Sequence, residues 1–350
     1  MIRRRLGTRI PAVLVAVVFA VVEAVVGSRD PAASLSAFFF APLSDPWRFA
    51  ALLESMAPLL VAGLGAGVAF RAGIFNLGGE GQAAAGFLVG SLFLSKVGGL
   101  TALLALPAAF LVAATAGALI AGLSGFAERR LGASVLLTSF LLSQAVLVAV
   151  DWAVAGPFRD HASNLLGMAS LPAAYVLPRL PGPMPVGMGP LLALLVTLAM
   201  IRLLRGSGPG FELELFGRSR EFARAQGLDP NLDLWPLALS GALSGFAGLL
   251  VTVGDSGQAV QGMTAGLGWN GLAVSLVAGT DPILSVPAAF LFAWLSEGSK
   301  AASILSDLSP ATASVIVALV MLLVTARSSG GRSKLGDAKT LPPARDADGA

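Results

Sequence analysis

The sequence lacks the residues on which redox and metal chemistry usually depend. It contains no cysteine and a single histidine, His161, among 350 residues. The absence of cysteine excludes a disulfide framework, a Cys-ligated zinc site and an iron–sulfur cluster, and one histidine does not build a His-based metal site. We therefore expect no metal and no cofactor.

Charged residues are also scarce. Asp, Glu, Lys and Arg make up 12% of the chain, whereas soluble domains carry roughly 25%. Hydrophobic residues make up 55%, and they form long runs between Ile10 and Val324. This composition excludes an ordinary soluble enzyme and predicts an all-α polytopic membrane protein. The net charge is +3, but the basic residues follow membrane topology, so we expect no nucleic-acid partner.

Catalytic motifs are missing as well. The chain has no Gly-x4-Gly-Lys-Ser/Thr string and therefore no Walker-type ATP site of its own. It also has no recognisable Ser/His/Asp triad or pair of carboxylates. We expect no catalytic residues, and any ATP energy must come from a partner.

Ten apolar stretches are candidate membrane spans. The third, eighth and ninth are shorter than the ~20 residues that a straight helix needs to cross ~30 Å of hydrocarbon. Short or Gly-interrupted spans indicate broken helices that are shielded inside a bundle. Glycine pairs at four-residue spacing, such as Gly63 with Gly67 and Gly241 with Gly245, predict close helix packing. The spans cover approximately residues 10–26, 53–70, 81–97, 100–123, 135–154, 188–204, 234–253, 267–279, 283–297 and 312–325.

The basic residues predict that both termini are cytoplasmic. If each span crosses once and the arginine cluster at residues 3–9 lies inside, 17 of the 23 Lys and Arg residues lie on the cytoplasmic side, as the positive-inside rule requires. A cleaved signal peptide over residues 1–27 is the rival reading. We favour a retained helix because the apolar stretch is 17 residues long and no A-x-A site follows it.

Residues 1–326 therefore form one transmembrane domain with two longer polar segments. Residues 155–187 are rich in Pro and Gly and contain His161, which predicts an outer loop. Residues 205–233 form the longest charged segment on the cytoplasmic side. Residues 327–350 lack apolar periodicity, and we expect a disordered cytoplasmic tail.

A short internal repeat is visible. The string PAAFL at residues 107–111, in the fourth span, returns at residues 287–291, in the ninth. Because an offset of five spans reverses the direction of crossing, the pair predicts an inverted five-helix repeat, which is typical of transporters.

The junction between the second and third spans is the most informative stretch. Residues 70–82 read FRAGIFNLGGEGQ, with glycines and polar residues where a conventional aqueous loop has almost no room. Glycine permits the backbone to leave helical geometry, and Asn76, Glu80 and Gln82 can satisfy the freed backbone groups. We expect these three residues to pin a broken backbone beside a translocation path, with direct ligand contact as a second possibility. A plain cytoplasmic turn anchored by Arg71 is the alternative.

This string resembles the FRAGxFNIGxEGQ signature of ABC-importer permeases for nucleosides and related ligands, a branch of the branched-chain amino acid and ribose permease superfamily. Residues 221–227, EFARAQG, resemble the family's EAARxxG coupling segment. Residues 240–249 and 268–274 resemble its SGALAGLAG and GFNGIAVA runs, with Trp269 in place of Phe. The resemblance extends over residues 50–325.

The resemblance implies a type II ABC importer-like fold of about ten helices in the bacterial cytoplasmic (inner) membrane. It implies a heterodimer with a second permease, of which this chain resembles the longer member, together with ABC ATPase subunits, an extracytoplasmic substrate-binding lipoprotein and membrane lipids. The implied ligand is a nucleoside, while riboflavin, a purine base and a sugar stay open. The implied ATPase-coupling residues are Glu221, Ala223, Arg224 and Gly227. On residues alone, that segment is a solvated basic face.

Trp269 and Asn270 are further ligand candidates. An indole ring can stack on a planar base or isoalloxazine, and an amide can hydrogen-bond the edge of such a ring. The alternative role of Trp269 is that of a lipid-facing or interfacial anchor.

Two other classes of protein compete with the importer. The inverted repeat fits an ion-coupled secondary transporter equally well, although the sequence shows no convincing carboxylate in the middle of a span. An integral membrane enzyme acting on lipid-linked substrates needs catalytic residues at the membrane face, which the sequence does not show.

Overall fold

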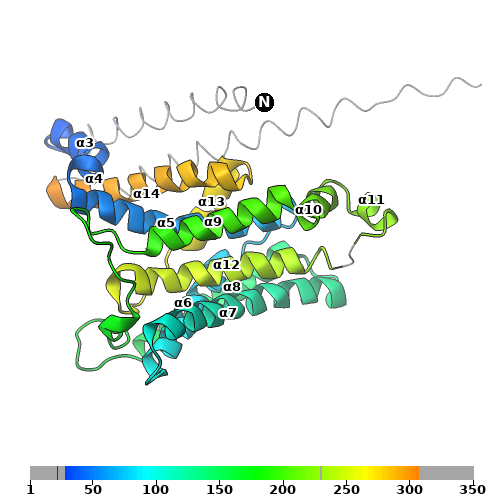
Figure 1. Cartoon of the computed structure of the whole chain (residues 1–350), viewed down its shortest axis with the longest axis horizontal. Helices are drawn as coiled ribbons and strands as arrows, with labels where there is room; N and C mark the ends of the chain where they lie inside the picture. The colour runs from blue at the N-terminus through cyan, green and yellow to red at the C-terminus, as the bar shows by residue number, and fades with distance from the viewer. Residues whose placement is uncertain (1–21, 23–27, 229–230, 307–350) are drawn as a thin grey trace, which may run out of the picture.

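The computed structural model describes Val22, residues 28–228 and residues 231–306 (Figure 1). The predicted first and tenth spans and the predicted tail lie outside these residues, except that Val22 is helical. In the described ranges the chain consists of helices and loops, with a short 3-10 helix at Ala173–Tyr175 and two isolated β-bridges. The predicted all-α class is confirmed for this part of the chain.

Two short helices, α3 (Pro31–Phe39) and α4 (Ala41–Ser44), precede a bundle of longer ones. The bundle and its connections comprise α5 (Pro46–Arg71), α6 (Gly79–Lys96), α7 (Ala102–Leu131), α8 (Val135–Ala155), α9 (Gly189–Gly206), α10 (Gly208–Arg218), α11 (Arg220–Ala225), α12 (Trp235–Val251), α13 (Leu267–Ala278) and α14 (Pro282–Leu305). Each predicted span from the second to the ninth lies on one of these helices.

One length prediction was wrong. The ninth span was expected to be short, yet α14 has 24 residues. The apolar run ends near Leu295, but the Glu, Lys and Ala residues that follow are good helix formers, so the helix continues past the point where hydropathy falls. By contrast, α13 has only 12 residues, as the sequence predicts.

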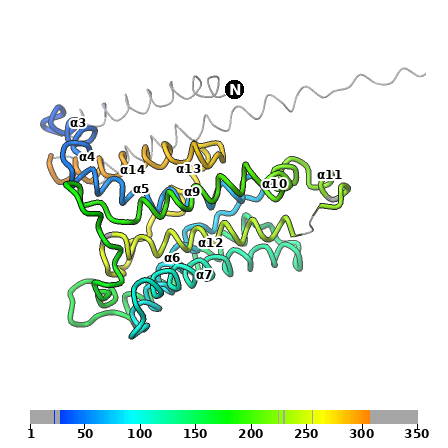
Figure 2. The backbone as a smooth tube through the Cα atoms, in the orientation of Figure 1, coloured from blue at the N-terminus to red at the C-terminus, as the bar shows by residue number. Residues whose placement is uncertain are grey.

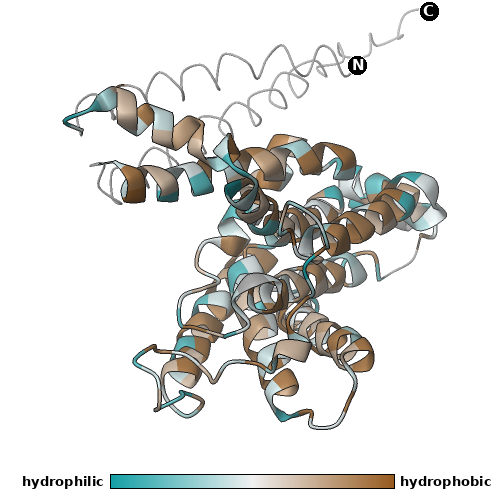
Figure 3. Ribbon diagram, turned by 60° about the vertical axis from the view of Figure 1, so that its left-hand side comes forward, coloured by the Kyte–Doolittle hydropathy of each residue, from teal (hydrophilic) through white to brown (hydrophobic). Residues whose placement is uncertain are grey.

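The helices α5 and α12 form the centre of the bundle. They pack against each other, while α12 also contacts α6 and α7, and α5 also contacts α13, α14 and α9. Within the described residues, five helices are long and apolar enough to cross a membrane, namely α5, α7, α8, α9 and α12 with the turn that follows it. The apolar windows of α5 and α12 are 61% and 67% buried, whereas those of α7, α8 and α9 are at most 28% buried. The apolar residues of α7, α8 and α9 are therefore mostly not buried within the described bundle. Hydrophobic residues predominate along most of the helices (Figure 3).

Glycine permits the closest helix contacts. A Cβ atom at Gly86 of α6 would overlap the backbone of Gly245 on α12, and a Cβ at Gly117 of α7 would overlap the carbonyl oxygen of Gly241. The predicted small-residue packing is confirmed at these positions. Helix α12 is thus held between α6 and α7 with backbone against backbone.

The bundle has two different ends (Figure 2). At one end α5, α7 and α9 finish, and α10 and α11 extend beyond them (Figure 1). Ion pairs connect this end to the segment 205–233: Arg129 with Asp233, and Arg220 with Glu128 at 3.8 Å. At the other end lie α3, α4 and the segment 155–187. There the hydroxyl of Tyr175 donates to the carbonyl oxygens of Val97 and Leu100. The basic residues predicted to lie inside and outside therefore separate to opposite ends of the described bundle.

Candidate functional site

Two interruptions of the helical backbone meet inside the bundle. After α5, residues 72–78 are not helical, and Gly73 has a φ of +69°. Before α13, residues 257–266 form an irregular segment, and Gly266 has a φ of +81°. The first turns of α6 and α13 then touch, because a Cβ at Gly268 would overlap the backbone nitrogen of Glu80. Glycine is favoured at both positions because it has no Cβ atom to clash when φ is positive.

The depth of this junction follows from the length of α13. Its C-terminal end lies beside Arg71, which bonds the carbonyl of Thr280 at the end of the bundle that carries α10. A helix of 12 residues is about 18 Å long. The first turns of α6 and α13 therefore lie about 18 Å along α13 from that end of the bundle.

Glu80 caps the N-terminus of α13. Its carboxylate accepts hydrogen bonds from the backbone N–H groups of Gly266, Gly268 (2.7 Å) and Trp269 (3.2 Å). The side chain is 6% exposed. A carboxylate at this position satisfies amides that have no partner within the helix and compensates the positive end of the helix dipole. Glu80 thus connects the first turn of α6 to the first turn of α13.

Asn76 and Gln82 form a second buried connection. The two side-chain amides bond each other reciprocally at 3.0 Å, and the Asn76 side chain also bonds the Ser240 hydroxyl of α12 and the Gly78 N–H. Asn76 is 2% exposed and Gln82 is fully buried. These bonds hold the non-helical residues before α6 against α12.

Two serines of α8 complete the set of acceptors for the broken backbone. The Ser139 hydroxyl accepts from Leu77 N–H at 3.1 Å, and the Ser143 hydroxyl accepts from Gly81 N–H at 2.7 Å. These two serines and Ser240 were not among the predicted site residues. Their signal was present, since Ser139 and Ser143 are polar residues four positions apart in a largely apolar helix and therefore lie on one face.

Arg71 joins three further elements. Its guanidinium donates to the carbonyl oxygen of Thr280 at 3.0 Å and to that of Leu204 at 3.1 Å. These carbonyls belong to the turn between α13 and α14 and to the last turn of α9. The residue therefore contributes specific bonds at the end of the bundle, in addition to the charge that the sequence reasoning assigned to it.

Trp269 and Asn270 lie in the first turn of α13. The Trp269 side chain is 45% exposed, and its ring meets Phe140 of α8 edge to face with 6.3 Å between ring centroids. Asn270 is half-buried beside Gly266. Among the described residues, neither side chain has a hydrogen-bond partner. Their predicted contact with a ligand stays a prediction.

The predicted coupling residues lie together at the end of the bundle. Glu221 is exposed on the short helix α11, and the neighbouring Phe222 is 50% exposed. Ala223 is buried, and Gly227 has a φ of +70°, which ends the segment after α11. Arg224 is also part of α11. The segment is thus a protruding helical element with an exposed aromatic residue.

A direct contact links this element to the signature loop, residues 72–78 between α5 and α6. A Cβ atom at Gly217 of α10 would overlap the carbonyl oxygen of Arg71, and a Cβ at Gly73 would lie 3.2 Å from the carbonyl oxygen of Gly217. The backbone before α6 therefore rests on α10 without intervening side chains.

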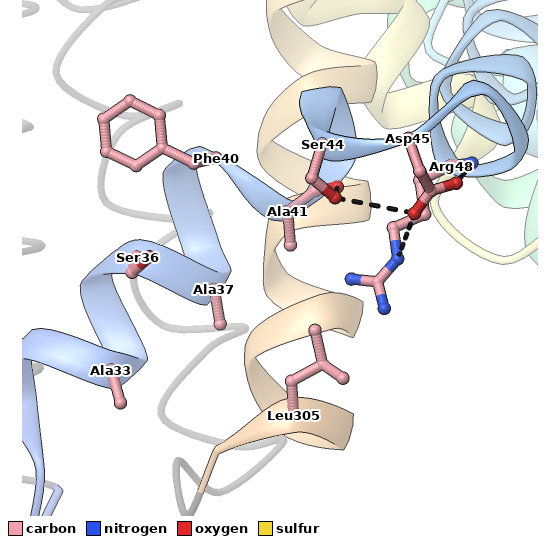
Figure 4. A pocket seen from close by; sticks show the side chains of 9 residues that line it. All are labelled: Ala33, Ser36, Ala37, Phe40, Ala41, Ser44, Asp45, Arg48 and Leu305. Atoms are coloured by element: carbon pink, nitrogen blue, oxygen red, sulfur yellow. Dashed lines mark hydrogen bonds and ion pairs between the residues drawn. The ribbon is translucent and has the colours of Figure 1, made fainter.

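A pocket of about 400 Å³ lies elsewhere, between α3, α4 and the end of α14 (Figure 4). Asp45 there caps α5 through the N–H groups of Trp47 and Arg48, and it pairs with the Arg48 side chain at 3.0 Å. The pocket includes none of the predicted site residues, so it does not extend the site at the helix junction. Within the described ranges, no group of three or more Asp, Glu or His residues is placed to hold a metal ion.

The chain is similar in sequence to several permease proteins. The chain is 33% identical over 316 residues to the probable riboflavin import permease protein RfuC of Treponema pallidum, covering 90% of this chain and 83% of that protein. It is 27% identical to the glucose ABC transporter permease protein TsgB13 of Haloferax volcanii, over 94% of this chain and 90% of that protein. It is also 27% identical to the guanosine ABC transporter permease protein NupP of Bacillus subtilis, over 78% and 79% of the two chains.

No solved structure shows a significant match to this chain. The relatives are permease subunits of ABC transporters and not enzymes. Residues 48–325 match the family described as the branched-chain amino acid transport system / permease component. This match covers most of the chain. It includes residues 72–78, residues 221–227 and the irregular segment 257–266 before α13. The chain therefore belongs to the branched-chain amino acid transport system / permease component family, as a multi-pass, non-catalytic ABC permease.

Proposed function

We propose that this chain is the transmembrane subunit of an ATP-driven importer for a nucleoside or a nucleoside-like ligand. Riboflavin, a purine base and a sugar are the other ligands to test, since relatives are named for riboflavin, glucose and guanosine. The observation that carries the proposal is the contact of Gly217 with Arg71 and Gly73. This contact joins α10 and α11, at one end of the bundle, to the non-helical residues before α6.

The coupling follows from this contact. An ATPase subunit binds α11 through Glu221, Phe222 and Arg224, while Ala223 packs inward and Gly227 ends the element. Closure of the ATPase dimer displaces α10 and α11 together. The displacement reaches α6 through the signature loop and α13 through Arg71 and Thr280. The bundle then opens the path to the other side of the membrane.

An inverted repeat of five helices explains which helices of the bundle pack against each other. In this scheme α5, α6 and α7 correspond to α12, α13 and α14. The contacts of α12 with α6 and α7 then match those of α5 with α13 and α14. The first turns of α6 and α13, which touch, lie at the symmetry axis. Pro107 and Pro287 each lie in the second turn of their helices, α7 and α14. Ten spans result if one helix before α3 and one after α14 complete the two halves.

The assembly that we propose is the one implied by the family. This chain pairs with a second, different permease in the cytoplasmic membrane of a bacterium, with both termini inside. Two ATPase subunits bind the end that carries α11. An extracytoplasmic lipoprotein delivers the ligand at the opposite end, near α3, α4 and the segment 155–187. The described arginines at the α11 end support this orientation.

Substitution of Phe222 tests the coupling. We expect Phe222→Asp, in the complex purified from its own host, to lower ligand-stimulated ATP hydrolysis at least about tenfold, because it places a charge in an apolar contact. The matched control is Leu131→Asp at the same end of the bundle, where Leu131 is 79% exposed at the end of α7. Equal activity of the Phe222→Asp variant and the wild-type complex would overturn the assignment of α11.

An ion-coupled secondary transporter is the alternative, because inverted repeats occur in both classes. Native mass spectrometry of the tagged chain in mild detergent separates the two. The importer predicts a second permease and two ATPase copies in the complex. The alternative predicts this chain alone, with uptake that depends on an ion gradient and not on ATP.

A further inference from the structure

The side chain of Gln144, in the middle of α8, takes no part in the hydrogen bonds at the helix junction. Gln144 is exposed, and it shares the outward face of α8 with Leu137, Leu141 and Val148, which are 58%, 64% and 72% exposed. Among the described residues, no hydrogen-bond partner faces its amide. An unpaired amide is costly in hydrocarbon, so such a residue normally faces water, a ligand or another protein group.

The position of Gln144 places it at the depth of the interrupted helices. Its neighbour Ser143 bonds Gly81 N–H in the first turn of α6. Phe140, one helical turn before Gln144 on the same side of α8, contacts the exposed ring of Trp269. Phe140 therefore lies between Gln144 on its own helix and Trp269 on α13. Asn270 follows Trp269 in the first turn of α13.

The polar side chains of residues 76–82 are already committed. Asn76 and Gln82 are buried and bond each other, and the Glu80 carboxylate is occupied by three amides of α13. The N-terminus of α13 is therefore closed to an anionic ligand, since a carboxylate of the chain itself occupies it. Beside them, the indole ring of Trp269 and the neutral amides of Gln144 and Asn270 stay free. This chemistry suits an uncharged planar ring with hydrogen-bonding groups on its edge.

We infer that Gln144, Trp269 and Asn270 are the ligand-contacting residues of this permease in its translocation path, and that the ligand they accept is uncharged. Trp269 stacks on the planar ring of the ligand, while Gln144 and Asn270 bond its edge. This inference rests on the proposed function. It adds which residues contact the ligand and that the ligand is uncharged. It removes Asn76, Glu80 and Gln82 from direct contact.

The absence of cysteine from the chain provides a direct test. In the purified complex, the single-cysteine variant Gln144→Cys is treated with a charged, water-soluble methanethiosulfonate reagent, and labelling of this chain is followed by mass spectrometry. The probes are guanosine, riboflavin and guanosine 5′-monophosphate. The matched control is Thr115→Cys, because Thr115 is also exposed in the middle of a span but its hydroxyl bonds the Leu111 carbonyl of its own helix.

We expect the Gln144→Cys variant to be labelled and the Thr115→Cys variant to stay unlabelled. Guanosine or riboflavin at ten times its dissociation constant should slow labelling roughly 10-fold by occupancy alone, and the monophosphate should not. A Gln144→Cys variant that resists labelling lies in lipid or in the permease interface, and one that is labelled without protection lies in water away from the ligand. Either result overturns the inference. Failure of the proposed function appears separately, as a wild-type complex without ATPase subunits.

Discussion

The contact between α7 and α12 leads to a sharp prediction about Gly117. A Cβ at this position would overlap the carbonyl oxygen of Gly241 and lie 2.9 Å from the nitrogen of Gly245. Ordinary Cβ contacts are 3.4–4 Å, so Gly117→Ala forces the two helices apart by about 1 Å and removes close contacts along both. Overpacking of this kind costs about 1–3 kcal/mol. The gain in helix propensity from alanine, about 1 kcal/mol, offsets only part of that cost.

The same helix offers the control. Gly122 is also in α7, but nothing lies within 4 Å of a Cβ built there. Gly122→Ala therefore gains helix propensity without a clash, and we expect it to be neutral or stabilising. The assay is the fraction of detergent-solubilised protein that stays monodisperse in size-exclusion chromatography after heating. We expect Gly117→Ala to lower the temperature at which half of the protein stays monodisperse, the heating midpoint, by several degrees relative to Gly122→Ala. Equal midpoints would refute the packing that we describe.

Two further substitutions test the connections at the helix junction. Glu80→Ala leaves three backbone amides at the N-terminus of α13 without their acceptor, so we expect a loss of about 3 kcal/mol or more and a lower heating midpoint in the same assay. Glu214→Ala, which removes an exposed ion pair with Arg218, should cost less than about 1 kcal/mol. Arg71→Lys retains the charge but not the forked donors that bond Thr280 and Leu204, so we expect faster hydrogen–deuterium exchange in residues 72–78. Unchanged exchange there would contradict the role of Arg71 as a connection between helices.

The broad class of the protein follows from composition and periodicity. Long apolar runs fix where helices form in a membrane, because backbone groups have no other partners there. The predicted spans from the second to the ninth accordingly coincide with helices, and the short α13 is visible as a short apolar stretch. The length of α14 was missed because helix propensity continues after hydropathy falls.

The local peculiarity of residues 70–82 is also readable from the sequence. Four glycines together with Asn76, Glu80 and Gln82 predict a broken backbone stabilised by side chains, and the structure has such bonds. The partners of these residues were not predictable. Glu80 bonds amides almost two hundred residues later in the chain, and nothing in either local sequence specifies that pairing.

The sequence by itself thus determined the membrane class, the helix positions and the family, because each depends on residue types and short spacings. Only the tertiary structure decided which polar groups are already satisfied and which stay free. Glu80 and Gln144 illustrate the difference. Glu80 stands in a conspicuous motif, yet its carboxylate is used within the fold. Gln144 belongs to no motif and is exposed on the side of α8 that carries Phe140. Whether a polar side chain has a partner depends on contacts between distant segments, and these exist only in the folded chain.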